Sequence, residues 1–208
     1  MPASVGNNDW NQDRIPNPLP DFSDHAVPCP ATQGGAMPSD HAEVQVRPGD
    51  EGDLAALTDL YNHYVRETAV TFDTTPFTPA ERRPWLLSHP VDGPHRLMVA
   101  TDAGSGRILG YASSSPFRAK PAYATSVETT VYVAPDAGRR GIGTLLYQAL
   151  FDALADEGLH RAYAGIAQPN AASTRLHERF GFRYVGTYRE VGHKFGRWWD
   201  VAWHEKEM

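Results

Sequence analysis

The 208-residue sequence has little of three things: cysteine, long apolar runs and excess positive charge. Its single cysteine, Cys29, cannot close an internal disulfide or build a thiolate metal cluster, so a cytoplasmic protein is the simplest expectation. No apolar run approaches the ~18 residues of a membrane span, and no basic segment followed by an apolar stretch marks a secretory signal. The net charge of −6 argues against a general nucleic-acid-binding protein.

Residues 1–42 differ in composition from the rest of the chain. They hold seven of the 17 prolines, and five aspartates against one arginine. Such a segment buries too little apolar surface to offset the entropy of ordering it. We therefore predict a disordered or loosely attached arm over 1–42. The remaining residues, 43–208, are expected to form one domain, because an apolar content of 41% supplies a sizeable core.

Within residues 43–208, hydrophobic periodicity predicts strands that alternate with helices. The Thr78-Pro79-Ala80-Glu81 capping box gives the sharpest helix start. The predicted strands are 43–47, 96–101, 107–115, 125–134, 161–167, 182–189 and 198–205, and the predicted helices are 53–65, 79–87, 141–157 and 170–180. This order indicates an α/β fold (a mixed, α+β-type sheet) with helices on both faces of the sheet.

The most informative segment is the loop Gly138-Arg139-Arg140-Gly141-Ile142-Gly143-Thr144, which joins strand 125–134 to helix 141–157. The first turn of a helix carries free N–H groups and the positive end of the helix dipole. Glycines let the backbone approach a phosphate, and the arginines add positive charge. The loop fits neither a P-loop nor a dinucleotide-binding fingerprint. From these residues alone, a phosphate site and a tightly packed turn both remain possible.

This loop resembles the acetyl-CoA loop of GCN5-related N-acetyltransferases (GNAT), usually Gln/Arg-x-x-Gly-x-Gly/Ala, with Gly138 at the first position here. A second family motif, an early helical Asn followed by Gly-Phe, is matched by Asn170 and Gly181-Phe182. Four further segments resemble the phosphinothricin and methionine sulfoximine acetyltransferase branch: Asn62–Tyr64, Val127–Val133, Pro169–Glu178 and Gly192–Trp198. The resemblance covers about residues 43–208. It implies the GNAT fold, a twisted mixed sheet between helices, with acetyl-CoA as co-substrate.

The resemblance implies three groups of acetyl-CoA-binding residues: the strand edge beside pantetheine, the phosphate loop, and the start of helix 170–180. They are Val131, Tyr132 and Val133; Arg139, Arg140, Gly141, Ile142, Gly143 and Thr144; and Asn170 and Ser173. A backbone N–H near Val133 is the expected oxyanion donor. Gly138 lacks the side chain that relatives carry at its position. No spacing of His, Cys and carboxylate residues suggests a metal.

Acetyl transfer to an amine needs a base for the amine and a way for the thiolate to leave. Glu128 lies in a strand of apolar and threonine residues, on the same face as Thr130 and Tyr132. Burial there would raise its pKa toward a useful range, and the resemblance implies that it is the catalytic base. The alternative is a surface glutamate. His177 stands where many relatives carry the tyrosine proposed as the acid for the thiolate. The alternative to this acid role is a histidine that lies in the interior with its hydrogen bonds satisfied, or at the surface.

The resemblance places the substrate carboxylate at the loop 117–123, where Arg118 is the expected clamp. The other expected substrate contacts are Lys120, Tyr123, Thr129, Thr130 and Phe72. An ordinary basic surface loop is the alternative. The resemblance also implies a homodimer in which the 194–199 stretch lies near the subunit contact. Two other functions stay open: acetylation of a different amine, and a non-catalytic acyl-CoA sensor.

Overall fold

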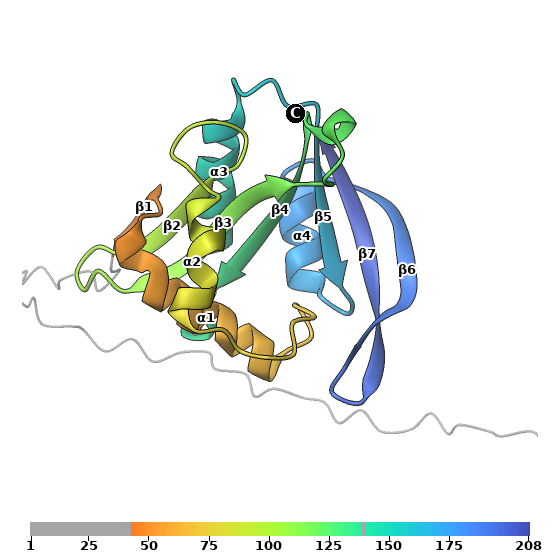
Figure 1. Cartoon of the computed structure of the whole chain (residues 1–208), viewed down its shortest axis with the longest axis horizontal. Coiled ribbons are helices and arrows are strands. Elements are labelled where there is room, and N and C mark those ends of the chain that lie inside the picture. The colour runs from red at the N-terminus through yellow and green to blue at the C-terminus, as the bar shows by residue number, and fades with distance from the viewer. Residues whose placement is uncertain (1–42, 139) are drawn as a thin grey trace, which may run out of the picture. The chain divides into compact units, whose positions relative to one another are not determined.

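The computed structural model describes residues 43–138 and 140–208. The predicted arm, with Cys29, and the predicted cofactor contact Arg139 lie outside the described residues. Seven strands form one sheet in the order β1-β2-β3-β4-β5-β7-β6 (Figure 1). The strands are β1 (Val44–Pro48), β2 (Leu97–Asp102), β3 (Ile108–Pro116), β4 (Ser126–Val133), β5 (Arg161–Ala167), β6 (Arg183–Lys194) and β7 (Arg197–Glu207). Only β4 and β5 pair in parallel, which confirms the predicted mixed sheet.

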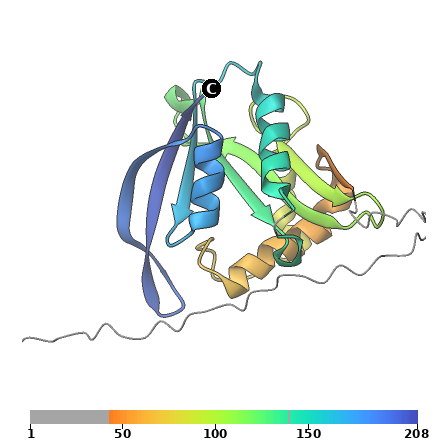
Figure 2. The same ribbon diagram turned by 180° about the vertical axis from the view of Figure 1, so that it is seen from behind.

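Four helices cover the two faces of the sheet, as predicted. Helices α1 (Leu54–Glu67) and α2 (Pro79–Leu87) lie on the face seen in Figure 1. Helices α3 (Ile142–Leu154) and α4 (Ala171–Arg179) lie on the opposite face, seen in Figure 2. The capping box is present, because the Thr78 side chain accepts from the Glu81 N–H. No helix among the described residues is long and apolar enough to cross a membrane.

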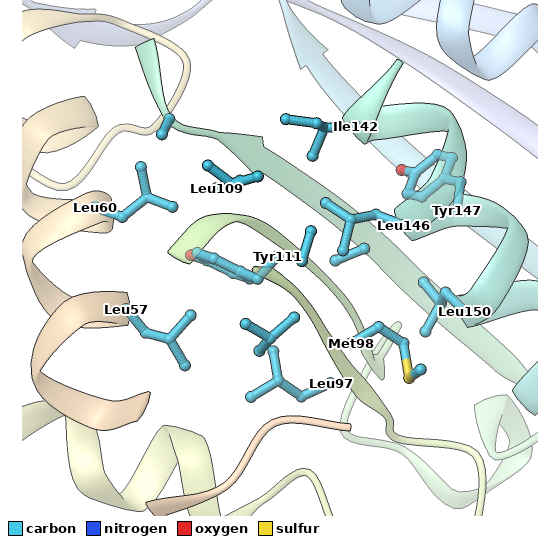
Figure 3. Packing of buried hydrophobic residues seen from close by; sticks show 14 of the residues in the cluster. Leu57, Leu60, Leu97, Met98, Leu109, Tyr111, Ile142, Leu146, Tyr147 and Leu150 are labelled. Atoms are coloured by element: carbon cyan, nitrogen blue, oxygen red, sulfur yellow. The ribbon is translucent and has the colours of Figure 1, made fainter. Parts of the chain in front are cut away.

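The hydrophobic core has two layers, one on each side of the central strands (Figure 3). Leu57 of α1 packs toward one face, and Leu146 and Leu150 of α3 pack toward the other, all with no exposed surface. These α3 residues recur every four positions, so they lie on one side of the helix. The core therefore holds β3 and β4 rigidly from both sides.

The C-terminal hairpin is longer than the sequence predicted. Strand β6 continues to Lys194 and β7 begins at Arg197, so only Phe195 and Gly196 form the turn. Both have positive φ angles, 53° and 71°, as a two-residue turn of type I′ requires. Gly196 fits this conformation, but a phenylalanine seldom adopts it. The predicted strand ended at residue 189, where the pairing with β7 shifts register between Tyr188 and Gly192. Helix α3 ends at Leu154, three residues before the predicted end.

Candidate active site

Strands β4 and β5 part in the middle of the sheet. Their pairing covers only three residues on each strand, ending at Glu128 opposite Tyr163. Beyond that point a cavity of about 240 Å³ lies between them. Because Ala134 N–H donates to Leu109 O of β3, the alternation along the strand turns the Val133 N–H away from β3 and toward this cavity. The predicted Val131, Tyr132 and Val133 all line it.

A second cavity, of about 470 Å³, adjoins the first at the start of α3. The two cavities share Val133, Ala172 and Leu176 as lining residues, so they form one continuous groove. The predicted loop residues Gly141, Ile142, Gly143 and Thr144 line the second cavity. This brings the phosphate loop and the strand edge together, as the sequence predicts.

The two glycines of this loop have different tasks. Gly141 caps α3 with a φ angle of 71°, in the left-handed region that favours glycine. A Cβ at Gly143 would lie 3.1 Å from the Leu176 side chain of α4. Gly143 therefore lets α4 approach the first turn of α3, which narrows the groove there. A phosphate could reach the backbone of this turn without meeting a side chain at position 143.

Positive charge at this end of the groove comes from residues that the sequence analysis missed. Arg175 and Arg179 of α4 line the second cavity. Their four-residue spacing on a helix next to the glycine loop is the signal that would have found them. The predicted Arg140 is exposed, and its guanidinium lies 3.8 Å from the Asp102 carboxylate.

Asn170 caps α4 at the inner end of the groove. Its Oδ1 accepts a hydrogen bond from the Ser173 N–H at 3.1 Å. Asn170 and Ser173 both line the first cavity, so the predicted capping role and a ligand-facing position hold together.

Glu128 lies at the point where β4 and β5 part. Its backbone is paired with Ser115 of β3 on one side and with Tyr163 of β5 on the other. Burial raises the pKa of its carboxyl group, and the nearby Arg118 guanidinium opposes that shift. The prediction that burial raises this pKa is therefore confirmed. A carboxylate with raised proton affinity, placed where the groove begins, is suited to accept a proton.

The structure argues against His177 as an acid. Its Nδ1 lies 2.8 Å from the Ser173 carbonyl and its Nε2 lies 2.8 Å from the Tyr147 hydroxyl. A carbonyl only accepts, so Nδ1 carries the proton and Nε2 accepts from Tyr147. Burial lowers the pKa of His177 to about 4, so the ring is neutral at pH 7. Nε2 thus links α4 to Tyr147 of α3 and Nδ1 is bonded within α4, so no proton remains for a leaving thiolate.

This burial makes His177 a source of acid sensitivity. Its pKa lies below the unfolded value of about 6.5, so its contribution to stability is complete above pH 6.5 and is lost as the pH falls toward 4. The loss amounts to about 3 kcal/mol at ~1.4 kcal/mol per pKa unit. In His177→Gln, the amide can serve both partners without titrating, so thermal denaturation should show a smaller fall in Tm between pH 7 and 4.5. The exposed His160→Gln should keep the wild-type slope; an unchanged slope in His177→Gln would refute this assignment.

A third cavity, of about 340 Å³, lies on the α1–α2 side of β4. Thr130 and Tyr132 line both this cavity and the groove, so the two spaces meet along β4. The cavity is lined by Tyr61, Asp73, Phe77, Glu81, Arg82, Trp85, Tyr111, Ser113, Ser115, Thr130 and Tyr132. Because strand side chains alternate between faces, Thr130 and Tyr132 point to the same side of the sheet as Glu128, and the cavity lies on that side.

The structure separates the two predicted threonine contacts. Thr130 lines the α1–α2 cavity, and its Oγ1 lies 3.0 Å from Ser113 Oγ. Thr129 is 2% exposed and points to the opposite face, where its Oγ1 lies 3.4 Å from the Tyr147 hydroxyl. Both threonines line the first cavity, although their side chains point to opposite faces of the sheet because successive strand residues alternate. The substrate contacts expected of Thr129 and Thr130 remain predictions.

Among the predicted substrate-loop residues, Arg118 is the one whose charge lowers the pKa of Glu128. Its guanidinium stacks on the Phe117 ring at 4.1 Å, and Tyr123 meets the same ring at 6.0 Å. Lys120 is exposed. None of Arg118, Lys120 and Tyr123 lines the α1–α2 cavity.

Phe72 belongs to a contact between the α1–α2 loop and the C-terminal hairpin. Its ring occupies the space that a side chain on Gly192 of β6 would fill. The neighbouring Lys194 is 4% exposed, and its Nζ donates to the Thr71 carbonyl at 2.8 Å. Phe72 thus braces the loop that carries Asp73, rather than lining the cavity itself.

Metal ligation has no support in the described ranges. Over 43–138 and 140–208, no group of three or more His, Cys, Asp or Glu residues could hold a metal ion.

Comparison with known proteins gives consistent results. The model of the acetyltransferase (GNAT) domain matches residues 47–203. The chain is 80% identical over 167 residues to a phosphinothricin N-acetyltransferase of Streptomyces coelicolor, covering 80% of this chain and 98% of that protein. It is 37% identical over 165 residues to an L-methionine sulfoximine/L-methionine sulfone acetyltransferase of Pseudomonas aeruginosa, covering 79% and 95%.

Solved structures show the same fold. A GNAT phosphinothricin acetyltransferase of Sinorhizobium meliloti in complex with acetyl-CoA superposes with a TM-score of 0.75 at 30% identity, over 79% of this chain and 88% of that one. A Salmonella typhimurium acetyltransferase with acetyl-CoA gives a TM-score of 0.74 at 33% identity, over 79% and 93%. With the domain match, these relatives show that the chain belongs to the GNAT family of acetyltransferases.

Proposed function

We propose that this protein transfers the acetyl group of acetyl-CoA to the α-amine of a small amino-acid-like acceptor such as phosphinothricin or methionine sulfoximine. One observation carries the proposal: Glu128 lies where β4 and β5 part, with a groove on one side of β4 and a cavity on the other. The groove suits the cofactor, because the glycine loop and two arginines line its outer end. The relatives named for these two acceptors support the substrate class.

The cofactor groove and the α1–α2 cavity meet along β4 at Thr130 and Tyr132, and we place the reaction at that meeting point. Acetyl-CoA supplies the thioester carbonyl that the amine attacks. Glu128 accepts the proton of the incoming ammonium, directly or through a water molecule. The Val133 N–H, turned toward the groove, donates to the carbonyl oxygen as it becomes negative. The attacking nitrogen then gives up a second proton, which can pass to the leaving thiolate without a dedicated acid.

The test is thiol release from acetyl-CoA with the purified protein. L-phosphinothricin and L-methionine sulfoximine are compared with leucine, spermidine and a peptide. We expect turnover with the first two alone. Turnover confined to another amine would replace the acceptor class, and acetyl-CoA binding without turnover on any amine would favour a sensor.

Arg175 and Arg179 are predicted to bind the cofactor phosphates. Replacing both with alanine removes two positive charges from the groove, so KM for acetyl-CoA should rise roughly 10-fold, equivalent to about 1.4 kcal/mol. The value of kcat should stay within about 3-fold, because neither residue lies at Glu128. The exposed Arg189→Ala on β6 is the control for loss of charge alone. An unchanged KM in the double variant would contradict the phosphate role.

We further propose a homodimer formed through the β6–β7 hairpin. The hairpin exposes large apolar side chains, each more than half accessible: Tyr184, Val185, Tyr188, Val191, Phe195 and Trp198. Exposed apolar patches of this kind are typical of association surfaces. Sedimentation equilibrium should give twice the chain mass, and Trp198→Glu should shift it toward the monomer. The proposal also includes a cytoplasmic location and, where phosphinothricin is the acceptor, resistance to that compound.

A further inference from the structure

A buried arginine on α2 faces the acceptor side of the site. Arg82 lines the α1–α2 cavity and is 7% exposed. Its guanidinium carbon lies 4.0 Å from the ring centroid of Tyr61 and 4.0 Å from that of Trp85. The planar cation is therefore stacked between two aromatic faces, which fixes its orientation.

One edge of the guanidinium lacks acceptors. Its Nε and Nη2 are buried, and neither has a hydrogen-bond partner within residues 43–138 and 140–208. Leaving such donors unpaired costs free energy, and the cost is larger for a charged group. Nε and Nη2 form one edge of the guanidinium, the edge that pairs in a bidentate manner with a carboxylate or a similar oxyanion. Stacking compensates the charge in part but supplies no acceptor.

The acids around the cavity do not fill this role. Asp73 and Glu81 are both exposed, and each carboxylate has another partner. The Asp73 carboxylate accepts from the Tyr61 hydroxyl, and the Glu81 carboxylate accepts from Thr78. Burial raises the pKa of the Tyr111 phenol, and the charge of Arg82 and a hydrogen bond from its side chain oppose that shift, which places the cation at the Tyr111 end of the cavity. Arg82 is thus the buried charge of the cavity.

Glu128 adjoins the cavity through its strand partner Ser115, and the charge of Arg118 reaches it. The cavity begins at Ser115, the β3 partner of Glu128, and extends past Thr130 to Tyr132. Arg118 lies C-terminal to Ser115, on the side of Ser115 away from the cavity residues of β3, and its charge opposes the rise in the pKa of Glu128. An acceptor whose amine lies at Glu128 can therefore place one anionic group toward each arginine.

We propose that Arg82 binds an anionic side-chain group of the acceptor, so that the site selects amino acids carrying a second acidic group, such as a phosphinate. This inference rests on the proposed function and deepens it. It assigns the unpaired guanidinium edge to the phosphinate oxygens, which reach it when the ligand displaces the side chains that cover it, and leaves the α-carboxylate to Arg118.

The test compares L-phosphinothricin, which carries a phosphinate, with L-methionine sulfone, whose side chain is neutral. In Arg82→Met, kcat/KM for phosphinothricin should fall about 10- to 100-fold, mostly through KM, the range of a charge-assisted hydrogen bond. The value for the sulfone should change less than about 3-fold. Arg82→Lys should fall between, because it keeps the charge but loses the bidentate edge. The control is Arg83→Met, the next residue of α2, which is exposed and pairs with Glu51 at 2.8 Å.

The outcomes separate this inference from the proposed function. An equal loss on both acceptors, or no loss, with acetyl-CoA binding intact, would overturn the Arg82 assignment. Where Arg82→Met does not fold, as judged by near-ultraviolet circular dichroism, the same comparison is made with Arg82→Lys. Where the wild type acetylates neither acceptor, the proposed function fails, and calorimetry of phosphinothricin with wild type and Arg82→Lys decides the site. Binding lost only in the variant supports it, and equal binding overturns it.

Discussion

Replacing Glu128 by glutamine is expected to lower kcat by about 10²- to 10⁴-fold, the usual contribution of a positioned base. The amide keeps the size of the side chain but cannot accept the proton of the ammonium. Acetyl-CoA affinity should hardly change, because the glycine loop and α4 form the groove on the other side of β4. Stopped-flow or steady-state thiol release at saturating acetyl-CoA measures the effect.

The pH dependence of kcat/KM provides a second test of Glu128→Gln. Burial raises the pKa of Glu128, so wild-type kcat/KM should fall as the pH drops through that raised value and the carboxylate becomes protonated. In Glu128→Gln this acid limb should disappear. Glu178→Gln, an exposed substitution on α4, should match wild type throughout. A Glu128→Gln enzyme with more than a third of wild-type kcat would exclude Glu128 as the base.

Truncating Leu146 to alanine should lower the free energy of unfolding by about 2–5 kcal/mol, the range for a fully buried leucine. Leu146 has no exposed surface, and its Cδ1 packs beside Gly110 at the crossing of α3 with β3. For a domain of this size the Tm should fall by roughly 4–20 °C. Calorimetry checks this value.

Leu145→Ala is the matched control, since the neighbouring leucine is 43% exposed. Its effect on the free energy of unfolding should be within about 0.5 kcal/mol, as for ordinary surface positions. Below its own Tm, Leu146→Ala should keep near-wild-type kcat, because it touches neither Glu128 nor the groove. Equal destabilisation by both variants would mean that α3 does not pack as described.

Local sequence signals were sufficient for the elements that carry them. The capping box at Thr78 and the four-residue recurrence of Leu146 and Leu150 predicted two helices, and the glycine loop predicted one end of the groove. The raised pKa of Glu128 followed from a carboxylate in an apolar strand. Each of these depends on neighbours in sequence or on a single strand.

Features set by distant contacts could not be predicted in this way. A buried histidine with two partners looks the same in sequence as a histidine that faces a ligand, so the partners of His177 on α3 and α4 were out of reach. Arg82 reads as one of several charges on an ordinary helix, and only the Tyr61 and Trp85 rings reveal that it is stacked and buried. The sequence does not indicate a positive φ at Phe195, so the two-residue turn of the hairpin could not be predicted.

The contact between the C-terminal hairpin and the α1–α2 loop affects how the specificity of such a protein can change in evolution. Lys194 and Gly192 hold Thr71 and Phe72, the residues just before Asp73 in the wall of the α1–α2 cavity. The shape of that wall therefore depends on two stretches of chain more than a hundred residues apart. Substitutions in the hairpin can change which amine fits while the proton acceptor and the cofactor groove stay as they are. The preferred acceptor can thus change during evolution while the protein keeps its acetyltransferase activity.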